Sequence, residues 1–365
     1  MLELDIDALS ALGLTPALAA RAAAIEMQPT DGDAAYELAR VVEVHRETID
    51  VHDGCCERRA RMLPRLVRSL NDEGSALAVG DWVIVSRGAT RERWLMARVP
   101  PSSHISRRDG DGRVHPIVSN VDVALLVMGL DNDFNPRRLE RYLVLVHGQG
   151  IVPVVVLTKL DIALADARLL DERMATLRKR VPSHIDICSV DATNASAAGV
   201  LRPYCEGNRT LVLLGSSGAG KSTLTNTLLG ASIQDTGAVR ENDGRGKHTT
   251  TSRSLHRLPG GASIIDTPGL RTLRLDGDQA MLEAGFADIA TLARRCRFAD
   301  CAHEHEPGCA VRASIDADRL QNFKKLEREA RRDTLTALDR KRQLAQWKVR
   351  SRAAREHLRR KRGEG

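Results

Sequence analysis

Gly215-Ser216-Ser217-Gly218-Ala219-Gly220-Lys221-Ser222 is the stretch that decides the fold of this 365-residue chain. Glycines at this spacing permit backbone angles that aim successive N–H groups inward, as in loops that bind phosphate. Lys221 adds positive charge at the outer phosphates, and Ser222 offers a hydroxyl to Mg²⁺. An apolar run before the loop predicts a buried strand, and residues 223–229 predict a helix whose N-terminus faces the anion. A glycine-rich turn that binds nothing is the alternative, and the complete set of fixed residues argues against it.

A second motif, Thr158-Lys159-Leu160-Asp161, follows residues 152–157, an apolar run that predicts a strand covered on both faces. The motif therefore lies at the carboxyl edge of a sheet, where α/β domains bind ligands. The Asp161 carboxylate can accept from both N1–H and the 2-amino group of guanine, and adenine lacks these two donors. Lys159 is expected to lie along the base, and Thr158 replaces the usual asparagine with a shorter tether.

The order of these motifs predicts a circular permutation. In an ordinary GTPase the phosphate loop comes first and the base-reading motif comes near the end, whereas here the order is reversed. Asp266-Thr267-Pro268-Gly269 follows later and is suited to hold Mg²⁺ through Asp266 and to sense the γ-phosphate through the Gly269 N–H. The glycine-rich segment 244–251 brings threonine hydroxyls, of which Thr250 is the preferred Mg²⁺ ligand. The predicted nucleotide-contacting residues are Thr158, Lys159, Leu160, Asp161, Gly215, Ser216, Ser217, Gly218, Ala219, Gly220, Lys221, Ser222, Thr223, Thr249, Asp266 and Gly269.

A cluster of cysteines and histidine near the C-terminus predicts a metal site. Three thiolates and one imidazole fill a tetrahedral Zn²⁺ shell with no open position, so the site is expected to be structural. His305 and Glu306 compete as ligands, and free thiols or redox chemistry are the further alternatives. The cluster contains Cys296, Cys301, His303 and Cys309.

The chain length and the strand pattern predict a multi-domain protein. Short, partly alternating strands predict an oligonucleotide-binding-like (OB-like) β-barrel, which either binds RNA or serves only for packing. Longer apolar strands alternating with helices then predict a doubly wound α/β domain of the phosphate-loop class. The expected parts are an N-terminal helical extension (1–34), the barrel (35–115), the permuted GTPase domain (116–280) and a zinc-binding α domain with basic C-terminal helices (281–365).

The charge distribution points to a polyanionic partner. The net charge is +7, and residues 322–365 alone hold 16 Lys and Arg against 6 Asp and Glu. This basic tail predicts either a contact surface for RNA phosphates or a merely solvated helix. An acidic first segment and the lack of a long apolar run predict a cytoplasmic protein without a membrane span. The lack of a long heptad seam favours a monomer.

The combined motifs resemble the ribosome biogenesis GTPase RsgA family, which is circularly permuted and depends on the small ribosomal subunit. The resemblance runs from about residue 35 to about residue 311. It rests further on Val79-Gly80-Asp81-Trp82-Val83, on residues 133–142 (DFNPRRLERY) and on residues 244–251 (GRGKHTTT). The family match also selects His303 as the zinc ligand. Thr158, the N-terminal extension and the basic tail depart from the family pattern.

The resemblance implies a GTPase that binds the small (30S) ribosomal subunit and its 16S rRNA during late maturation, with Mg²⁺ as the ion that accompanies GTP. Leu270 follows Gly269 where many GTPases carry a water-orienting glutamine, so His248 is the best local candidate to position water. The catalytic set is therefore His248, Lys221 and Thr250, and a His248 that only contacts solvent or RNA is the alternative. Two rival functions are a GTP-gated RNA-binding regulator with negligible hydrolysis and a small-molecule kinase with a zinc-stabilised lid.

Overall fold

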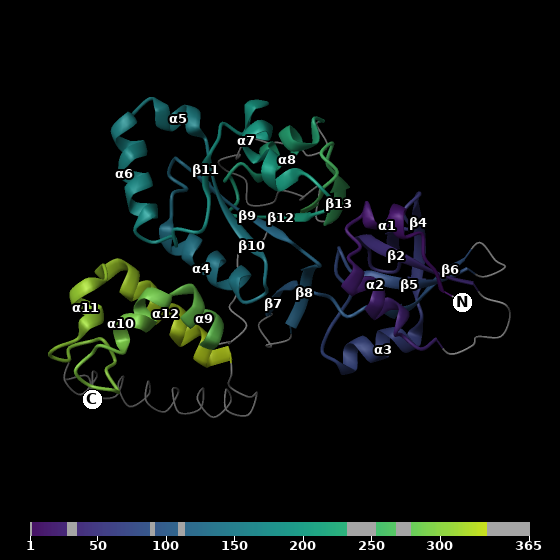
Figure 1. Cartoon of the computed structure of the whole chain (residues 1–365), viewed down its shortest axis with the longest axis horizontal. Coiled ribbons are helices and arrows are strands. Elements are labelled where there is room, and N and C mark those ends of the chain that lie inside the picture. Colours follow the sequence, from purple (N-terminus) through teal and green to yellow (C-terminus); the bar gives the residue numbers. More distant parts are fainter. Residues whose placement is uncertain are drawn as a thin grey trace, which may run out of the picture.

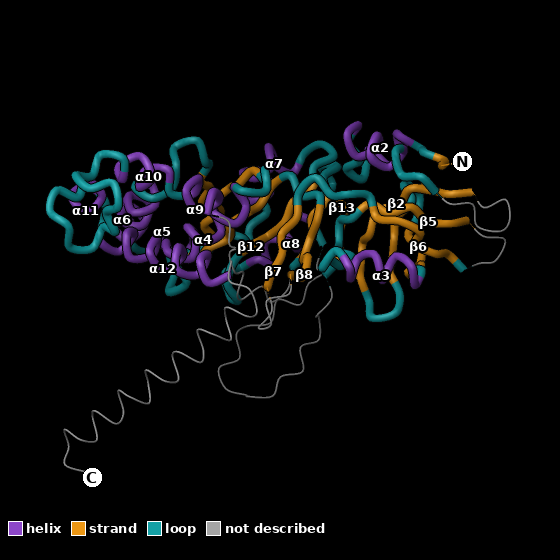
Figure 2. Tube along the Cα trace, turned by 90° about the horizontal axis from the view of Figure 1, so that it is seen from below, coloured by secondary structure: helices purple, strands orange, loops and turns teal. Residues whose placement is uncertain are grey.

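The computed structural model describes residues 2–27, 35–87, 92–108, 114–231, 253–267 and 279–333. A β-barrel, an α/β domain and a small helical domain follow one another along the molecule (Figure 1). The barrel and the C-terminal helices lie at opposite ends, which the turned view of Figure 2 also shows. Among the described residues, none of the helices combines the length and apolarity that a membrane crossing needs.

The N-terminal barrel is closed by five strands. They hydrogen-bond in the order β2-β3-β4-β6-β5, and β5 pairs back with β2, which is the connectivity of an OB fold. The predicted strands are confirmed, but the sequence reading missed β4, an arginine-rich strand whose Ala60 alone is fully buried, and helix α3 (Pro64–Asp72), which follows it. The strands are β2 (Ala35–Val44), β3 (Ile49–His52), β4 (Glu57–Met62), β5 (Trp82–Arg87) and β6 (Arg93–Arg98).

The N-terminal extension covers one side of this barrel. It contains the short strand β1 (Leu2–Glu3) and the helices α1 (Ile6–Ser10) and α2 (Pro16–Ala23). The predicted cap of α2 is confirmed, because the Thr15 hydroxyl accepts from the Leu18 N–H at 3.3 Å. Leu9 and Leu18 share a core cluster with the barrel's Trp82, so the extension packs as part of the barrel unit.

The central domain is a mainly parallel sheet in the order β11-β10-β9-β12-β14-β13, as the doubly wound prediction requires. Helices α4 (Pro136–His147) and α6 (Ala167–Arg178) contribute to the core on one face, and α7 (Ser196–Cys205) and α8 (Lys221–Leu229) to the core on the other. A hairpin of β7 (His104–Arg108) and β8 (Val114–Ser119) precedes the sheet. The strands are β9 (Val123–Gly129), β10 (Val152–Thr158), β11 (Ile187–Ser189), β12 (Thr210–Leu214), β13 (Ser254–Arg257) and β14 (Ser263–Asp266).

One strand joins the sheet to the barrel. The antiparallel strand β13, which the sequence reading did not predict, pairs with β14 along its length. Its first residue, Ser254, also pairs with Glu43 of the barrel strand β2. The barrel and the α/β domain are therefore parts of one continuous hydrogen-bonded sheet.

The C-terminal domain packs against helix α4. Its helices are α9 (Gln279–Gly285), α10 (Ala287–Ala293), α11 (Ala310–Ser314) and α12 (Ala317–Asp333). Phe286 and Leu326 belong to the same core cluster as Val144 of α4. A Cβ at Gly285 would lie 2.4 Å from the Val144 side chain, so close helix packing requires glycine there. The predicted helical tail beyond residue 333 lies outside the described residues.

Two buried charges sit where the barrel meets the α/β domain. Arg40 is fully buried and donates to the Thr210 hydroxyl at 2.8 Å and to the Asn120 carbonyl at 3.3 Å. Burial lowers the pKa of Arg40 to about 10 and raises the pKa of Asp81, which accepts from the Ala78 N–H at 2.9 Å, to about 6. The two groups lie close enough to interact through their charges. Because its pKa is about 6, Asp81 is ionised at neutral pH, although burial disfavours the charged form.

We expect Asp81 to make the protein less stable as pH rises from about 4 to about 6. Its pKa is higher in the folded chain than in the unfolded one, so the folded state binds the proton more tightly and loses that advantage as pH passes about 6. The full effect is ~3 kcal/mol in the free energy of unfolding. Denaturant unfolding followed by tryptophan fluorescence should give a shallower pH slope for Asp81→Asn, and parallel slopes would contradict this assignment.

Candidate nucleotide site and zinc centre

The phosphate loop adopts the geometry that its sequence predicts. It connects the end of β12 to the first turn of α8, with Gly218 and Gly220 in left-handed backbone conformations at φ +81° and +87°. Gly215 passes so close to β9 that a Cβ there would lie 2.3 Å from the Val127 carbonyl oxygen. The loop and the N-terminus of α8 together make a cradle of N–H groups for phosphate.

The side chain of Lys221 points back into its own loop. Its amine donates to the carbonyl oxygens of Gly215 at 2.9 Å and Ser216 at 2.6 Å. Burial is the main cause that lowers the pKa of Lys221, and the charges of Asp266 and Asp133 oppose that shift. A bound phosphate would therefore meet a lysine already positioned beside two carboxylates.

The base-reading segment touches the phosphate loop directly. Thr158, the last residue of β10, is fully buried, and its hydroxyl donates to the Ala219 carbonyl at 2.6 Å. Threonine thus tethers this segment to the phosphate loop, although its side chain is shorter than that of the usual asparagine. Lys159 has φ +59° and donates to Asp131 at 2.7 Å, while Asp161 is exposed in the first turn of α5 (Leu160–Leu164). The exposed carboxylate is available to a base.

A segment that the sequence reading did not assign borders the same site. The Val190 N–H donates to Leu157 at 2.8 Å, and the Val190 carbonyl accepts from Leu160 at 3.3 Å. The Thr227 hydroxyl of α8 donates to Ala192 at 2.6 Å. Residues 189–192 therefore lie between the base-reading segment and α8, where backbone groups could contact a base. The apolar run at residues 185–190, which predicts a strand, was the available signal.

The predicted magnesium site is described in part. Asp266 ends β14 and is buried, and the Thr267 hydroxyl donates to the Leu213 carbonyl at 2.9 Å. These contacts hold the start of the segment beside the phosphate loop. Four predicted residues of this site lie outside the described residues: His248, Thr249, Thr250 and Gly269.

The four favoured zinc ligands come together. Their ligand atoms all lie within 4.8 Å of one another, and His303 Nδ1 is 3.4 Å from Cys309 Sγ and 3.7 Å from Cys296 Sγ. Three thiols and one imidazole at these separations fit a tetrahedral Zn²⁺ ion. Cys296, Cys301, His303 and Cys309 could therefore hold one zinc ion.

The competing candidate Glu306 has another role. Its carboxylate accepts from the backbone N–H groups of Ala302, Glu304 and His305 at 2.8 to 3.0 Å. The backbone N–H of Glu306 itself, followed by these bonds, lowers the pKa of Glu306 to about 2, and the bonds fold the loop around its carboxylate. His303 takes a left-handed conformation in this loop, at φ +56°, and its carbonyl accepts from Lys324. The loop thus turns His303 toward the cysteines.

Comparisons with known proteins show what this chain is similar to. A family model described as RsgA GTPase matches residues 99–276. Proteins named small ribosomal subunit biogenesis GTPase RsgA from Xanthomonas axonopodis pv. citri and Xanthomonas oryzae pv. oryzae are each 46% identical over 299 residues, covering 80% of both chains.

Two solved structures share the fold. The crystal structure of YjeQ from Thermotoga maritima matches with a TM-score of 0.59 at 23% identity, over 81% of this chain and 98% of that one. YloQ, described as a circularly permuted GTPase, matches with a TM-score of 0.57 at 20% identity, over 86% and 100%. The order of the motifs in this chain is thus that of a known permuted fold.

Removing the Thr158 hydroxyl should weaken guanine-nucleotide binding. Thr158→Val keeps the side-chain shape but leaves the buried Ala219 carbonyl without this donor, so the loop loses its tether. We expect the Kd for GDP, measured by titration calorimetry, to rise about five- to tenfold, or ~1 to 1.4 kcal/mol. Thr176→Val, which removes an exposed hydroxyl bonded to the Glu172 carbonyl, is the matched control. An unchanged Kd for Thr158→Val would show that the tether is unimportant.

Substitution of His303 and of His305 tests which histidine is the zinc ligand. His303→Asn removes one of four ligands, so we expect the purified chain to lose its single zinc ion in native mass spectrometry. The C-terminal domain should then unfold at lower temperature. His305→Asn should retain one zinc ion per chain. Zinc loss from the His305 variant with retention in the His303 variant would reverse the ligand assignment.

Proposed function

The chain belongs to the RsgA GTPase family, and from that premise we propose that it hydrolyses GTP to GDP and phosphate during late maturation of the small ribosomal subunit. Its hydrolysis is stimulated when the subunit binds. One observation carries this proposal: the phosphate loop, the segment Thr158-Lys159-Leu160-Asp161 and Asp266 all lie at the same edge of the sheet. The sheet itself continues through β13 into the barrel. The partners are GTP, GDP, the small subunit and its 16S rRNA, and the protein acts in the cytoplasm as a monomer.

Guanine selectivity rests on Asp161. A carboxylate that accepts from two neighbouring donors of the base is left without partners when the base lacks them, and this penalty separates guanine from adenine. The tethered Thr158 keeps this segment in register with the phosphate loop. The base and the phosphates are then read by two segments that touch each other.

Hydrolysis requires an ion and a positioned water. Ser222, Thr250 and Asp266 would hold Mg²⁺, which neutralises charge that develops on the phosphates when GTP is bound. Lys221 contributes a second positive charge at the same phosphates. Because Leu270 cannot orient water, His248 takes that role, and Gly269 reports the presence of the γ-phosphate.

The barrel has a direct route to the segment that carries His248. Strand β13 begins at Ser254, three residues after Thr251, and Ser254 pairs with Glu43 of β2. Binding of the barrel to RNA therefore acts on the anchor of the threonine-rich segment. This supports turnover that depends on the partner, because ordering of a switch segment is a common way to complete a GTPase site.

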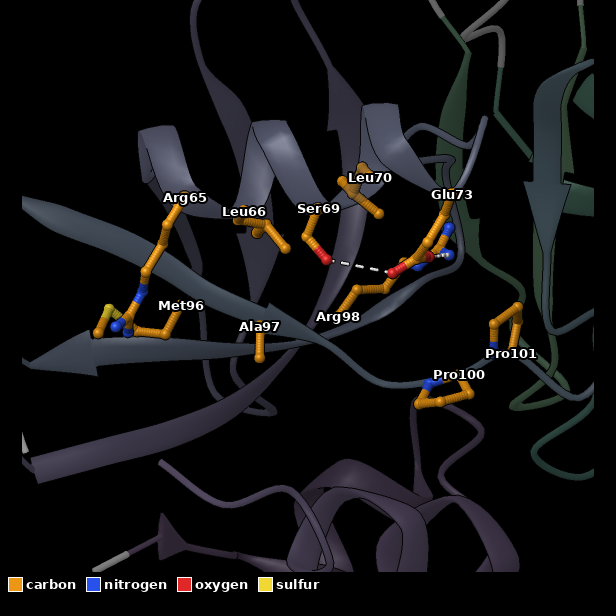
Figure 3. Close-up of a pocket in the computed structure, with 10 residues that line it drawn as sticks. All are labelled: Arg65, Leu66, Ser69, Leu70, Glu73, Met96, Ala97, Arg98, Pro100 and Pro101. Carbon is orange, nitrogen blue, oxygen red and sulfur yellow. Dashed lines mark hydrogen bonds and ion pairs between the residues drawn. The ribbon is translucent and has the colours of Figure 1, made fainter. Parts of the chain in front are cut away.

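One face of the barrel suits RNA phosphates. Arg61, Arg65 and Arg68 follow one another along β4 and α3 with exposed side chains, while Arg58 and Arg59 are ion-paired with aspartates. Figure 3 shows Arg65 at one end of a pocket of about 390 Å³ between α3 and β6, and Arg98 reaching toward Glu73, with which it is ion-paired. We assign this face and the basic tail to rRNA backbone contacts, which are sequence-independent and salt-sensitive.

Steady-state phosphate release separates the enzyme from its rival, a GTP-gated RNA-binding regulator with negligible hydrolysis. We expect purified small ribosomal subunits to raise the rate of GTP hydrolysis by at least tenfold, since the partner orders the switch segments. Large subunits serve as the control for nonspecific RNA. Tight GTP binding with no turnover in the presence of small subunits would favour the regulator instead.

His248→Ala should preserve nucleotide binding and remove the stimulated hydrolysis. The imidazole is proposed to position water only when the partner is bound, so the loss should appear in kcat with the Kd for GTP within about twofold. His184→Ala, at an exposed histidine between α6 and β11, is a suitable control because it lies away from the phosphate loop and from β13. Unchanged stimulated turnover in the His248 variant would exclude the residue from the mechanism.

A further inference from the structure

A carboxylate outside the nucleotide-binding motifs contacts the phosphate loop. Asp133 lies in the loop between β9 and α4, and its side chain is 13% exposed. One carboxylate oxygen accepts from the Gly129 N–H at 3.1 Å, and the other accepts from the Ser216 hydroxyl in a short hydrogen bond. Ser216 is the second residue of the phosphate loop, so Asp133 joins this loop to the end of β9.

Arg138 fixes the position of this carboxylate. Its guanidinium donates to the Asp133 side chain at 2.6 Å and also to the Asp133 backbone carbonyl. Both charges also act on Lys221, whose pKa Asp133 raises and Arg138 lowers. A lone carboxylate beside bound phosphates would repel them, and the paired guanidinium offsets that repulsion.

The helix that carries Arg138 is held in place from its other side. Glu140 is buried and accepts from Arg319 at 2.7 Å and from Asn322 at 2.6 Å, both on α12 of the zinc-binding domain. Arg137 donates to Asp318 at 2.8 Å, and Arg141 donates to Glu329 at 3.0 Å. Helix α4 is thus anchored over its first two turns, so Asp133 and Arg138 have a rigid support.

We propose that Asp133, held by Arg138, is a positioning residue of the nucleotide site that sets the phosphate loop through the Ser216 hydroxyl. This proposal rests on the proposed GTPase function and adds a contact that the phosphate-loop motif does not contain. Preorganising the loop lowers the ordering cost when phosphate binds, so the contact strengthens GDP and GTP binding alike. A purely local role for Asp133, through Gly129 alone, would not involve Ser216.

A double-mutant cycle distinguishes these roles. Asp133→Ala and Ser216→Ala should each raise the Kd for GDP and the KM for GTP about tenfold with kcat changed by less than twofold, because the contact exists before and after phosphate binds. The double variant should bind no more weakly than either single variant, since both remove one interaction. Ser216→Thr keeps the hydroxyl and should retain most of the affinity. Asp72→Ala, at an exposed carboxylate of the barrel, is the control.

Ser216→Ala keeps the test valid if Asp133→Ala lowers the stability of the fold. A Kd for GDP unchanged by Ser216→Ala, or losses that add in the double variant, would overturn the positioning role. Tight GDP binding by the unaltered chain together with either result would leave the proposed function standing. Absence of GDP binding by the unaltered chain would instead overturn both.

Discussion

The parallel register of β12 between β9 and β14 is the constraint on which the rest of this structure depends. Leu211 pairs with Val123 on one side and with Ile264 on the other, so the three strands end at the same edge. That register places the phosphate loop beside Asp266, and β10, one strand further, brings Thr158 within hydrogen-bonding distance of the loop. Permuting the chain leaves these neighbours unchanged, because the register rather than the chain order brings them together.

Permutation changes what the sheet is connected to. The threonine-rich segment continues into β13, which pairs with the barrel, and the chain after Asp266 continues into the C-terminal domain. A second connection to that domain passes through α4, whose N-terminal loop contacts the phosphate loop while Glu140 holds α12. The nucleotide site is therefore joined to both flanking domains by hydrogen bonds as well as by the chain. Such connections allow each domain to bias the conformation of the site.

Much of this arrangement could be predicted from sequence because glycine, cysteine and buried-strand patterns have strict physical requirements. The phosphate loop, the parallel strands and the cluster around His303 were identified in that way. Strand β4 was missed because four of its six residues are charged and only Ala60 is buried, which gives no apolar period. The contact of Asp133 with Ser216 joins residues 83 positions apart. Nothing in the sequence around either residue predicts that the two side chains form a hydrogen bond. Nor does the sequence predict that backbone N–H groups bind the Glu306 carboxylate.

The central claim is that the nucleotide bound at this sheet edge controls the affinity of the flanking domains for the small ribosomal subunit. The most direct measurement is cosedimentation of the full chain with purified small subunits, at fixed salt, with a nonhydrolysable GTP analogue, with GDP or without nucleotide. We expect binding at least tenfold tighter with the GTP analogue than with GDP, because the γ-phosphate, which GDP lacks, orders the switch segments that are joined to the flanking domains. Equal affinity in all three states would contradict it.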